Sequence, residues 1–255
     1  MTSTPYVILT TQRAGSVFLQ ESLSSHPEVH CDGEVLLGLD GFDAHPAPDR
    51  LERSRLVSHG WSFVAGGGLL APNRRLGRLY SSGLAPVIGC RVMYNQVQAR
   101  TLRWVRRNDV RVVHLSRGNL LRQYVSLVAM HRRVRESGRG VAHSRDGRRV
   151  AAVEIDLDRA TRFMRRRQRS VARFASFTRQ AGGLELQFER LIVDGALAPD
   201  VQQELAHFLG ISADFGTSSL TPTGAALLVD SIANYDEIAA SLTGSEFGGF
   251  LDDAS

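Results

Sequence analysis

A short apolar run that passes through a glycine-containing turn into a helical pattern is the feature that most restricts the fold of this chain. Residues 5–10 (PYVILT) are apolar and rich in β-branched side chains, which predicts a buried strand. Residues 16–24 (SVFLQESLS) then predict a helix. Further buried runs and helical patterns follow in alternation. Because strands that alternate with helices pair in parallel and need helices on both faces, the pattern predicts an α/β fold with a central, mostly parallel sheet.

Two segments interrupt this alternation because they lack a core pattern. The segment 35–86 is rich in glycine, proline and serine, and residues 135–149 predict an exposed loop. The 255 residues are enough for one large domain, which we expect to span residues 1–255. The other expected strands are 86–96, 110–117 and 184–191, and the other expected helices are 101–107, 119–132, 158–180, 199–210 and 231–244.

The basic residues are all arginine: the chain has 31 of them, no lysine and a formal net charge of +5. This usage is typical of a GC-rich genome, and it also excludes lysine chemistry. Any anion site must therefore use arginine, backbone N–H groups and hydroxyls. The two cysteines, Cys31 and Cys90, are too few for a disulfide framework or a metal cluster. No apolar run is long enough to span a bilayer and no secretory signal is visible, so we expect a cytoplasmic protein.

The turn between the first strand and the first helix has the chemistry of a phosphate site. The first N–H groups of a helix have no internal partner and carry the positive end of the helix dipole. Gly15 lets the backbone approach an anion, Arg13 adds a charge and Ser16 adds a hydroxyl. The loop is not a Walker A motif, because its second glycine and lysine are absent. An ordinary strand-to-helix turn with a solvated arginine remains the alternative interpretation.

Ligands of parallel sheets bind at the carboxyl ends of the strands, so polar residues at those ends are candidates for the site. The candidate stretches are 12–16, 91–94, 116–119 and 188–190.

A second polar pair follows a later strand. Arg117 stands at the end of the buried run VVHLS, and Ser126 lies nine residues further on, within the next predicted helix. An arginine and a nearby hydroxyl can share one phosphate group. Together with the turn RAGSVFL (13–19), this pair resembles the sulfotransferases that use 3′-phosphoadenosine 5′-phosphosulfate (PAPS). In that family, a loop R-S-G-S-T-x-L after the first strand holds the 5′-phosphosulfate, and an arginine followed eight or nine residues later by a serine holds the 3′-phosphate.

Other stretches extend the resemblance over most of the chain, toward the bacterial carbohydrate-type branch of the family. The resemblance implies a P-loop-like three-layer sandwich in which 35–86 and 133–160 are acceptor-binding insertions or a lid. The matching stretches are SHPEVHCDGE (25–34), GCRVMYNQ (89–96, with Arg91 where a lysine is usual), FERLIVD (188–194, often Tyr-Glu-Asp-Leu in the family) and the helix and tail at 231–251.

The resemblance also implies roles for single residues. Glu34, in a loop that should return to the carboxyl edge of the sheet, is expected to be the general base. His30 and His26 are rivals, and a solvated loop carboxylate is the plain alternative. Arg13 is expected to act in catalysis as well as in binding. The implied cofactor-binding residues are Arg13, Ala14, Gly15, Ser16, Val17, Phe18, Arg117, Ser126 and Phe188.

The chain departs from the family pattern at three of these positions. Ala14 and Val17 replace a serine and a threonine, so two hydroxyls that could bind the phosphosulfate are absent. Each such hydrogen bond contributes about 0.5–1.5 kcal/mol, so PAPS binding is either weaker or carried by Arg13 and the backbone N–H groups. Phe188 replaces a tyrosine and keeps the aromatic ring expected near adenine.

The sequence therefore predicts an enzyme that transfers a sulfonate from PAPS to a hydroxyl of a sugar, glycolipid or secondary metabolite and releases 3′,5′-ADP. We expect a small-molecule acceptor, no metal, no nucleic-acid partner and no membrane span, with homo-oligomerisation left open. Two alternatives stay open: a PAPS- or nucleotide-binding protein that has lost catalysis, and a nucleotide-dependent kinase-like enzyme.

Overall fold

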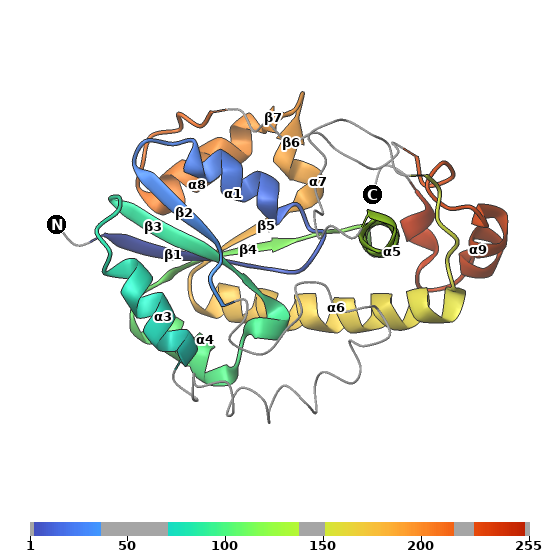
Figure 1. Cartoon of the computed structure of the whole chain (residues 1–255), viewed down its shortest axis with the longest axis horizontal. Coiled ribbons are helices and arrows are strands. Elements are labelled where there is room, and N and C mark those ends of the chain that lie inside the picture. The colour runs from blue at the N-terminus through green and yellow to red at the C-terminus, as the bar shows by residue number, and fades with distance from the viewer. Residues whose placement is uncertain (1–2, 37–70, 138–150, 217–226, 253–255) are drawn as a thin grey trace. The chain divides into compact units, whose positions relative to one another are not determined.

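The computed structural model describes residues 3–36, 71–137, 151–216 and 227–252 (Figure 1). Its contacts divide the chain into two compact units. Unit 1 consists of Met1–Ser116 and Phe174–Ser218, and unit 2 consists of Arg117–Arg173 and Ser219–Ser255. The single domain over 1–255 stays a prediction.

Unit 1 is built on a five-stranded sheet in which every pair of neighbouring strands is parallel. This arrangement confirms the predicted α/β fold with a central parallel sheet. The strands are β1 (Thr4–Thr10), β2 (Val29–Glu34), β3 (Val87–Met93), β4 (Arg111–Ser116) and β5 (Leu184–Gln187), in the order β2-β3-β1-β4-β5.

The central strand β1 explains why the sheet needs cover on both sides. Tyr6, Val7, Ile8 and Leu9 are all at most 1% exposed, so side chains on both faces of the strand are buried. Such a continuous apolar run is typical of parallel strands that lie between two layers of helices. Figure 1 shows helices on the two faces of the sheet, which completes the predicted three layers. One face carries α1 (Ser16–Ser24) and α8 (Pro199–Leu209), and the other carries α3 (Ala71–Tyr80) and α4 (Ala99–Arg107).

The edge strand β2 corrects the sequence prediction, which placed a loop at these residues. Among the described strands β2 pairs with β3 alone, and of its residues only Val29 and Cys31 are buried. Its apolar signal is therefore weak, and its Asp-Gly pair is typical of a turn. The strand carries a register shift between Asp32 and Glu34, and Glu34 pairs with Arg91 of β3. Glu34 thus ends a strand at the carboxyl edge of the sheet, where the sequence had predicted a returning loop.

Other boundaries differ from the prediction in smaller ways. The predicted strand 184–191 ends at Gln187, where a short helix begins, because Phe188 starts a turn of helix instead of continuing the ladder. Residues 135–137 of the predicted loop 135–149 belong to a helix, and residues 138–149 lie outside the described residues, as do 37–70 of the segment 35–86. The helices and strands not yet given for unit 1 are η1 (Tyr94–Gln96), α7 (Phe188–Leu191), β6 (Ile192–Val193) and β7 (Ala196–Leu197).

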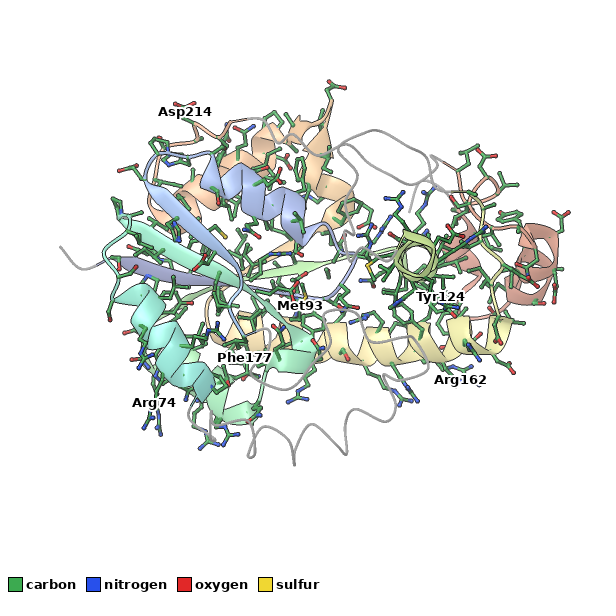
Figure 2. All side chains as sticks on the ribbon, in the orientation of Figure 1. Arg74, Met93, Tyr124, Arg162, Phe177 and Asp214 are labelled. Carbon is green, nitrogen blue, oxygen red and sulfur yellow. The ribbon has the colours of Figure 1, made fainter. Side chains whose placement is uncertain are left out.

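Unit 2 is helical and has its own core. Its helices are α5 (Leu120–Ser137), the first part of α6 (Leu157–Gln180, of which unit 2 holds the residues up to Arg173), α9 (Tyr235–Leu242) and η2 (Gly248–Leu251). Tyr124, which Figure 2 labels, packs in this core with Met164 and Phe247. Arg162, on the exposed side of α6, points away from it. Among the described residues, none of the helices has the length and hydrophobicity needed to cross a membrane.

Candidate active site

The turn between β1 and α1 has the geometry of an anion-binding loop. Arg13 and Gly15 adopt positive φ angles of 63° and 79°, and Gly15 is the N-cap of α1. Within the described part of the chain no side chain caps the helix, and its first turn contains no acidic residue. The first N–H groups of α1 therefore keep their hydrogen-bonding capacity and the positive end of the dipole for a ligand.

The contact with Phe188 explains why the N-cap residue of α1 is a glycine, Gly15. A Cβ atom at Gly15 would lie 2.2 Å from Cδ2 of Phe188, so the aromatic ring of α7 lies directly against the turn. Only glycine combines the positive φ with this close contact. The side chains of Ala14 and Phe18 are buried (0% and 6% exposed), so these two residues can offer a ligand only their backbone. Val17 is half-buried in the first turn of α1.

The largely buried side chain of Arg91, which is 11% exposed, joins this turn to the end of β2. Its Nη1 donates a hydrogen bond to Oγ of Ser16 at 3.2 Å and lies 4.0 Å from Oε1 of Glu34. Burial lowers the pKa of Arg91 from 12.5, and the charge of Glu34 opposes this shift. An arginine remains charged in proteins, so the site contains a guanidinium that water reaches poorly. In such surroundings its field acts more strongly on a nearby anion than it would in water.

Gln96 holds the carboxylate of Glu34 from the other side. Its Nε2 donates to Oε2 of Glu34 at 3.3 Å, and its Oε1 accepts a hydrogen bond from the backbone N–H of Met93 at 3.0 Å. Figure 2 labels Met93 at the end of β3, where the chain turns into η1. Because Gln96 is 4% exposed and is held by the backbone, its amide group presents N–H to Glu34. Glu34 therefore has one oxygen facing Arg91 and the other facing Gln96, while its side chain remains 25% exposed.

The two rival histidines lie elsewhere in unit 1. His26 is 2% exposed, accepts a hydrogen bond from the backbone N–H of Glu28, and bonds Oγ of Ser212 at 2.9 Å. His30 pairs with Ile88, three residues before Arg91 on β3, so it lies about 10 Å back from Glu34 along the sheet at 3.3 Å per residue. Of the three residues that the sequence offered as the base, Glu34 is the one at the carboxyl end of the strand.

His114 is a core histidine in the middle of β4. It is 1% exposed, with Nε2 2.5 Å from the hydroxyl of Tyr94 and Nδ1 3.9 Å from Oε2 of Glu185. Burial lowers its pKa to about 4, against the opposing charge of Glu185 and with a smaller contribution from Arg179. His114 is therefore neutral near pH 7, with its Nε2 hydrogen-bonded to Tyr94.

The cysteines are structural residues as well. Both thiols are free and buried, and burial raises the pKa of Cys31 to about 12 and that of Cys90 still further. Such thiols remain protonated and unreactive. Within the described ranges, no three His, Cys, Asp or Glu side chains come together to form a metal site.

Arg117 and Ser126 belong to unit 2. Arg117 directly follows the last residue of β4, and Ser126 lies on α5. Between them Asn119 begins α5: its Oδ1 accepts from the backbone N–H of Arg122, and its Nδ2 donates to the carbonyl of Phe250. Asn119 therefore ties the start of α5 to η2. The expected role of Arg117 and Ser126 in binding a 3′-phosphate stays a prediction.

Arg91 and Gln96, which contact Glu34, were not among the predicted site residues. The sequence placed Arg91 at a strand end and in a family-like stretch, and Gln96 closes the same stretch, GCRVMYNQ. What the sequence could not supply is the pairing of β2 with β3, which sets Glu34 opposite Arg91.

Comparison with known proteins supports the fold. No family model matches the chain, and no curated protein sequence matches it significantly. The chain is similar in structure to a crystal structure of a sulfotransferase from Alicyclobacillus acidocaldarius, with a TM-score of 0.52 and 15% sequence identity. The match covers 98% of this chain and 94% of that one. At this level of identity, the similarity shows a shared sulfotransferase-like α/β fold.

Proposed function

We propose that this protein is a sulfotransferase that moves a sulfonate group from PAPS to a hydroxyl group of a small acceptor such as a sugar, glycolipid or secondary metabolite. The observation that carries the proposal is the cluster of Ser16, Arg91 and Glu34 beside the N-terminus of α1. It combines an anion-binding turn, a buried cation and a carboxylate at the carboxyl end of a parallel sheet. These are the groups that transfer of an anionic sulfonate to a hydroxyl requires.

In the proposed mechanism, the turn binds the donor. The N–H groups at the start of α1, the hydroxyl of Ser16 and the guanidinium of Arg13 hold the 5′-phosphosulfate. The backbone supplies most of these bonds, because Ala14 and Val17 lack hydroxyls and the Ala14 side chain is buried. The family resemblance assigns the 3′-phosphate to Arg117 and Ser126 and the region of the adenine to Phe188.

Glu34 removes the proton of the acceptor hydroxyl. The acceptor oxygen then forms a bond to sulfur while the bond between sulfur and the phosphate oxygen breaks, and 3′,5′-ADP leaves with the electron pair of that bond. Arg91 lies beside both Ser16 and Glu34, so it is placed to stabilise the negative charge on the transferring group. Gln96 keeps the carboxylate oriented, which reduces the reorganisation needed at the moment of transfer.

One experiment distinguishes the proposed sulfotransferase from two alternative functions. The absence of hydroxyls at 14 and 17 supports a nucleotide-binding protein without transfer activity, and a phosphoryl-transfer enzyme would need magnesium and ATP. The test measures release of 3′,5′-ADP from PAPS with a library of hydroxyl compounds, in buffer with EDTA, alongside melting curves with 3′,5′-ADP and with ATP and magnesium. Acceptor-dependent release in EDTA supports the sulfotransferase. Binding of 3′,5′-ADP without release supports the binding protein, and activity only with ATP and magnesium supports the kinase-like enzyme.

A further inference from the structure

Two neighbouring helices of unit 1 form a surface made almost entirely of arginine. α3 and α4 pack side by side, since the rings of Tyr80 and Trp104 stack with centroids 6.3 Å apart. Both lie on the same face of the sheet (Figure 1). We call the exposed arginines of these helices the α3–α4 arginine surface: Arg74, Arg75, Arg78, Arg103, Arg106 and Arg107.

The sequence of each helix explains why its arginines face outward. Leu76 and Val105 are 0% and 2% exposed and turn one side of each helix toward the sheet. With 3.6 residues per turn, the arginines are left on the opposite side. Figure 2 shows Arg74 pointing away from α3 into solvent. The remaining aromatic groups, Tyr80 and Trp104, stack on each other and are only partly exposed.

Carboxylates offset part of the charge of α6, whereas on the α3–α4 arginine surface no such pairing is seen among the described residues. On α6, Arg159 pairs with Asp156, Arg165 with Glu246 and Arg179 with Glu185. Neither α3 (APNRRLGRLY) nor α4 (ARTLRWVRR) contains an acidic residue. In the ranges that the structure describes, no carboxylate forms an ion pair with the six arginines. These two helices hold more positive charge than the formal net charge of the whole chain, +5, so the rest of the chain is net acidic.

We propose that the α3–α4 arginine surface binds the anionic headgroups of a lipid bilayer. The arginines of two helices that lie flat on a sheet form a two-dimensional array, which matches a planar anionic surface. Clusters of about four to eight basic residues on amphipathic helices are typical of binding to anionic lipids. A single-stranded nucleic acid would need exposed aromatic rings on which its bases stack, and Tyr80 and Trp104 are occupied with each other. A sequence-reading duplex binder would need an element that enters a groove, whereas both helices are packed against the sheet.

The bound state is expected to be peripheral and salt-sensitive. The exposed side of each helix presents guanidinium groups and no large apolar side chain, so attraction to phosphate groups is the main contribution. This inference does not depend on the proposed reaction, because it concerns a face of the sheet and not the turn at its carboxyl end.

The test is co-sedimentation of the full chain with lipid vesicles. The vesicles consist of phosphatidylcholine alone or with about 30% phosphatidylserine, at about 0.1 M salt. The variant Arg103→Gln/Arg107→Gln removes two charges from the surface, and Arg162→Gln/Arg169→Gln removes two exposed charges from α6 as the matched control. We expect binding only to the anionic vesicles, about thirtyfold weaker binding for the first variant, and less than about twofold change for the control. About 0.5 M salt should release the protein.

Several results would overturn the proposal. These are absence of binding to anionic vesicles, equal binding to neutral vesicles, or equal losses in the two variants. A further arm measures binding of a duplex DNA at the same salt concentration. Tight, salt-dependent binding to the duplex without binding to vesicles would assign the surface to nucleic acid instead. Circular dichroism of both variants establishes that they are folded before they are compared, and Arg74→Gln/Arg78→Gln on α3 provides a second variant of the same surface.

Discussion

The guanidinium of Arg91 on β3 donates a hydrogen bond to the hydroxyl of Ser16, the first residue of α1, across 3.2 Å. The two residues are 75 positions apart in the sequence, and Nη1 of the same arginine lies 4.0 Å from Glu34. One side chain thus connects the anion-binding turn to the carboxylate proposed as the base. Removing any member of this cluster should therefore affect the other two.

The first prediction concerns the base. Glu34→Gln keeps the shape of the side chain and its contact with Gln96 but cannot accept a proton. General-base catalysis contributes about 10²–10⁴-fold, so turnover should fall by that order while 3′,5′-ADP binding is unchanged. Steady-state rates and a melting curve with 3′,5′-ADP check both parts. His30→Ala is the control and should cost far less, because His30 lies further back on β2. An inactive His30→Ala variant together with an active Glu34→Gln variant would make the histidine the base.

The second prediction concerns the cation. Arg91→Gln removes a buried charge-assisted hydrogen bond and should lower the free energy of unfolding by about 1.5–3 kcal/mol, measured in urea. It should also lower kcat, since the transferring group loses a nearby positive charge. Arg91→Lys keeps the charge but lacks the planar fork, and should recover part of both losses. The Arg91→Gln cost should shrink in a Glu34→Gln background. Equal costs in the two backgrounds would show that the pair does not interact.

The third prediction concerns the nucleotide. If Arg117 and Ser126 bind a 3′-phosphate, 3′,5′-ADP should stabilise the protein much more than 5′-AMP does. A ligand present at about 100 times its dissociation constant adds about 2.7 kcal/mol, which a melting curve resolves. Arg117→Ala should remove the preference between the two nucleotides. Equal shifts of the melting temperature with both nucleotides in the unmodified protein would contradict the assignment of the 3′-phosphate to Arg117 and Ser126.

The predictions from sequence were correct where a local sequence pattern determines the structure. They failed where the structure depends on pairing between residues far apart in the sequence. The strand β1 is a continuous apolar run, the helix Ser16–Ser24 follows it directly after a glycine turn, and both were predicted. The edge strand β2 was missed, because its apolar signal rests on Val29 and Cys31 alone. The contact between Gln96 and Glu34 joins residues 62 positions apart and exists only because β2 pairs with β3 in one register. No local pattern contains that register, so Gln96 was not predicted.

The fourth prediction concerns pH. The pKa of His114 is lowered to about 4 in the folded protein, below its ordinary value of 6.5. Between these two pH values the unfolded chain binds a proton that the folded chain does not, so stability is fully present above about pH 6.5 and falls as the pH drops toward 4. Urea unfolding at several pH values should show this loss. His114→Gln should flatten the slope, and an unchanged slope would mean that His114 does not titrate differently on unfolding.

The fifth prediction concerns the turn that the donor would occupy. Gly15→Ala places a Cβ 2.2 Å from Cδ2 of Phe188 and forces a side chain onto a backbone with φ of 79°. The left-handed conformation alone costs about 1–2 kcal/mol for a residue with a Cβ, and the contact with the ring adds to this. The variant should therefore unfold at lower urea concentration and lose affinity for 3′,5′-ADP, because the first N–H groups of α1 move with the turn.

A double-mutant cycle separates the two contributions. Phe188→Ala removes the ring, so Gly15→Ala should cost less in that background, and the difference between the two costs measures the contact. The part that remains should match the cost of the positive φ. Gly182→Ala supplies the matched control, because Gly182 has φ of 63° and a Cβ there would meet nothing within 4 Å. If Gly15→Ala costs no more than Gly182→Ala, Phe188 does not press on the turn, and its proposed place beside the nucleotide loses its structural support.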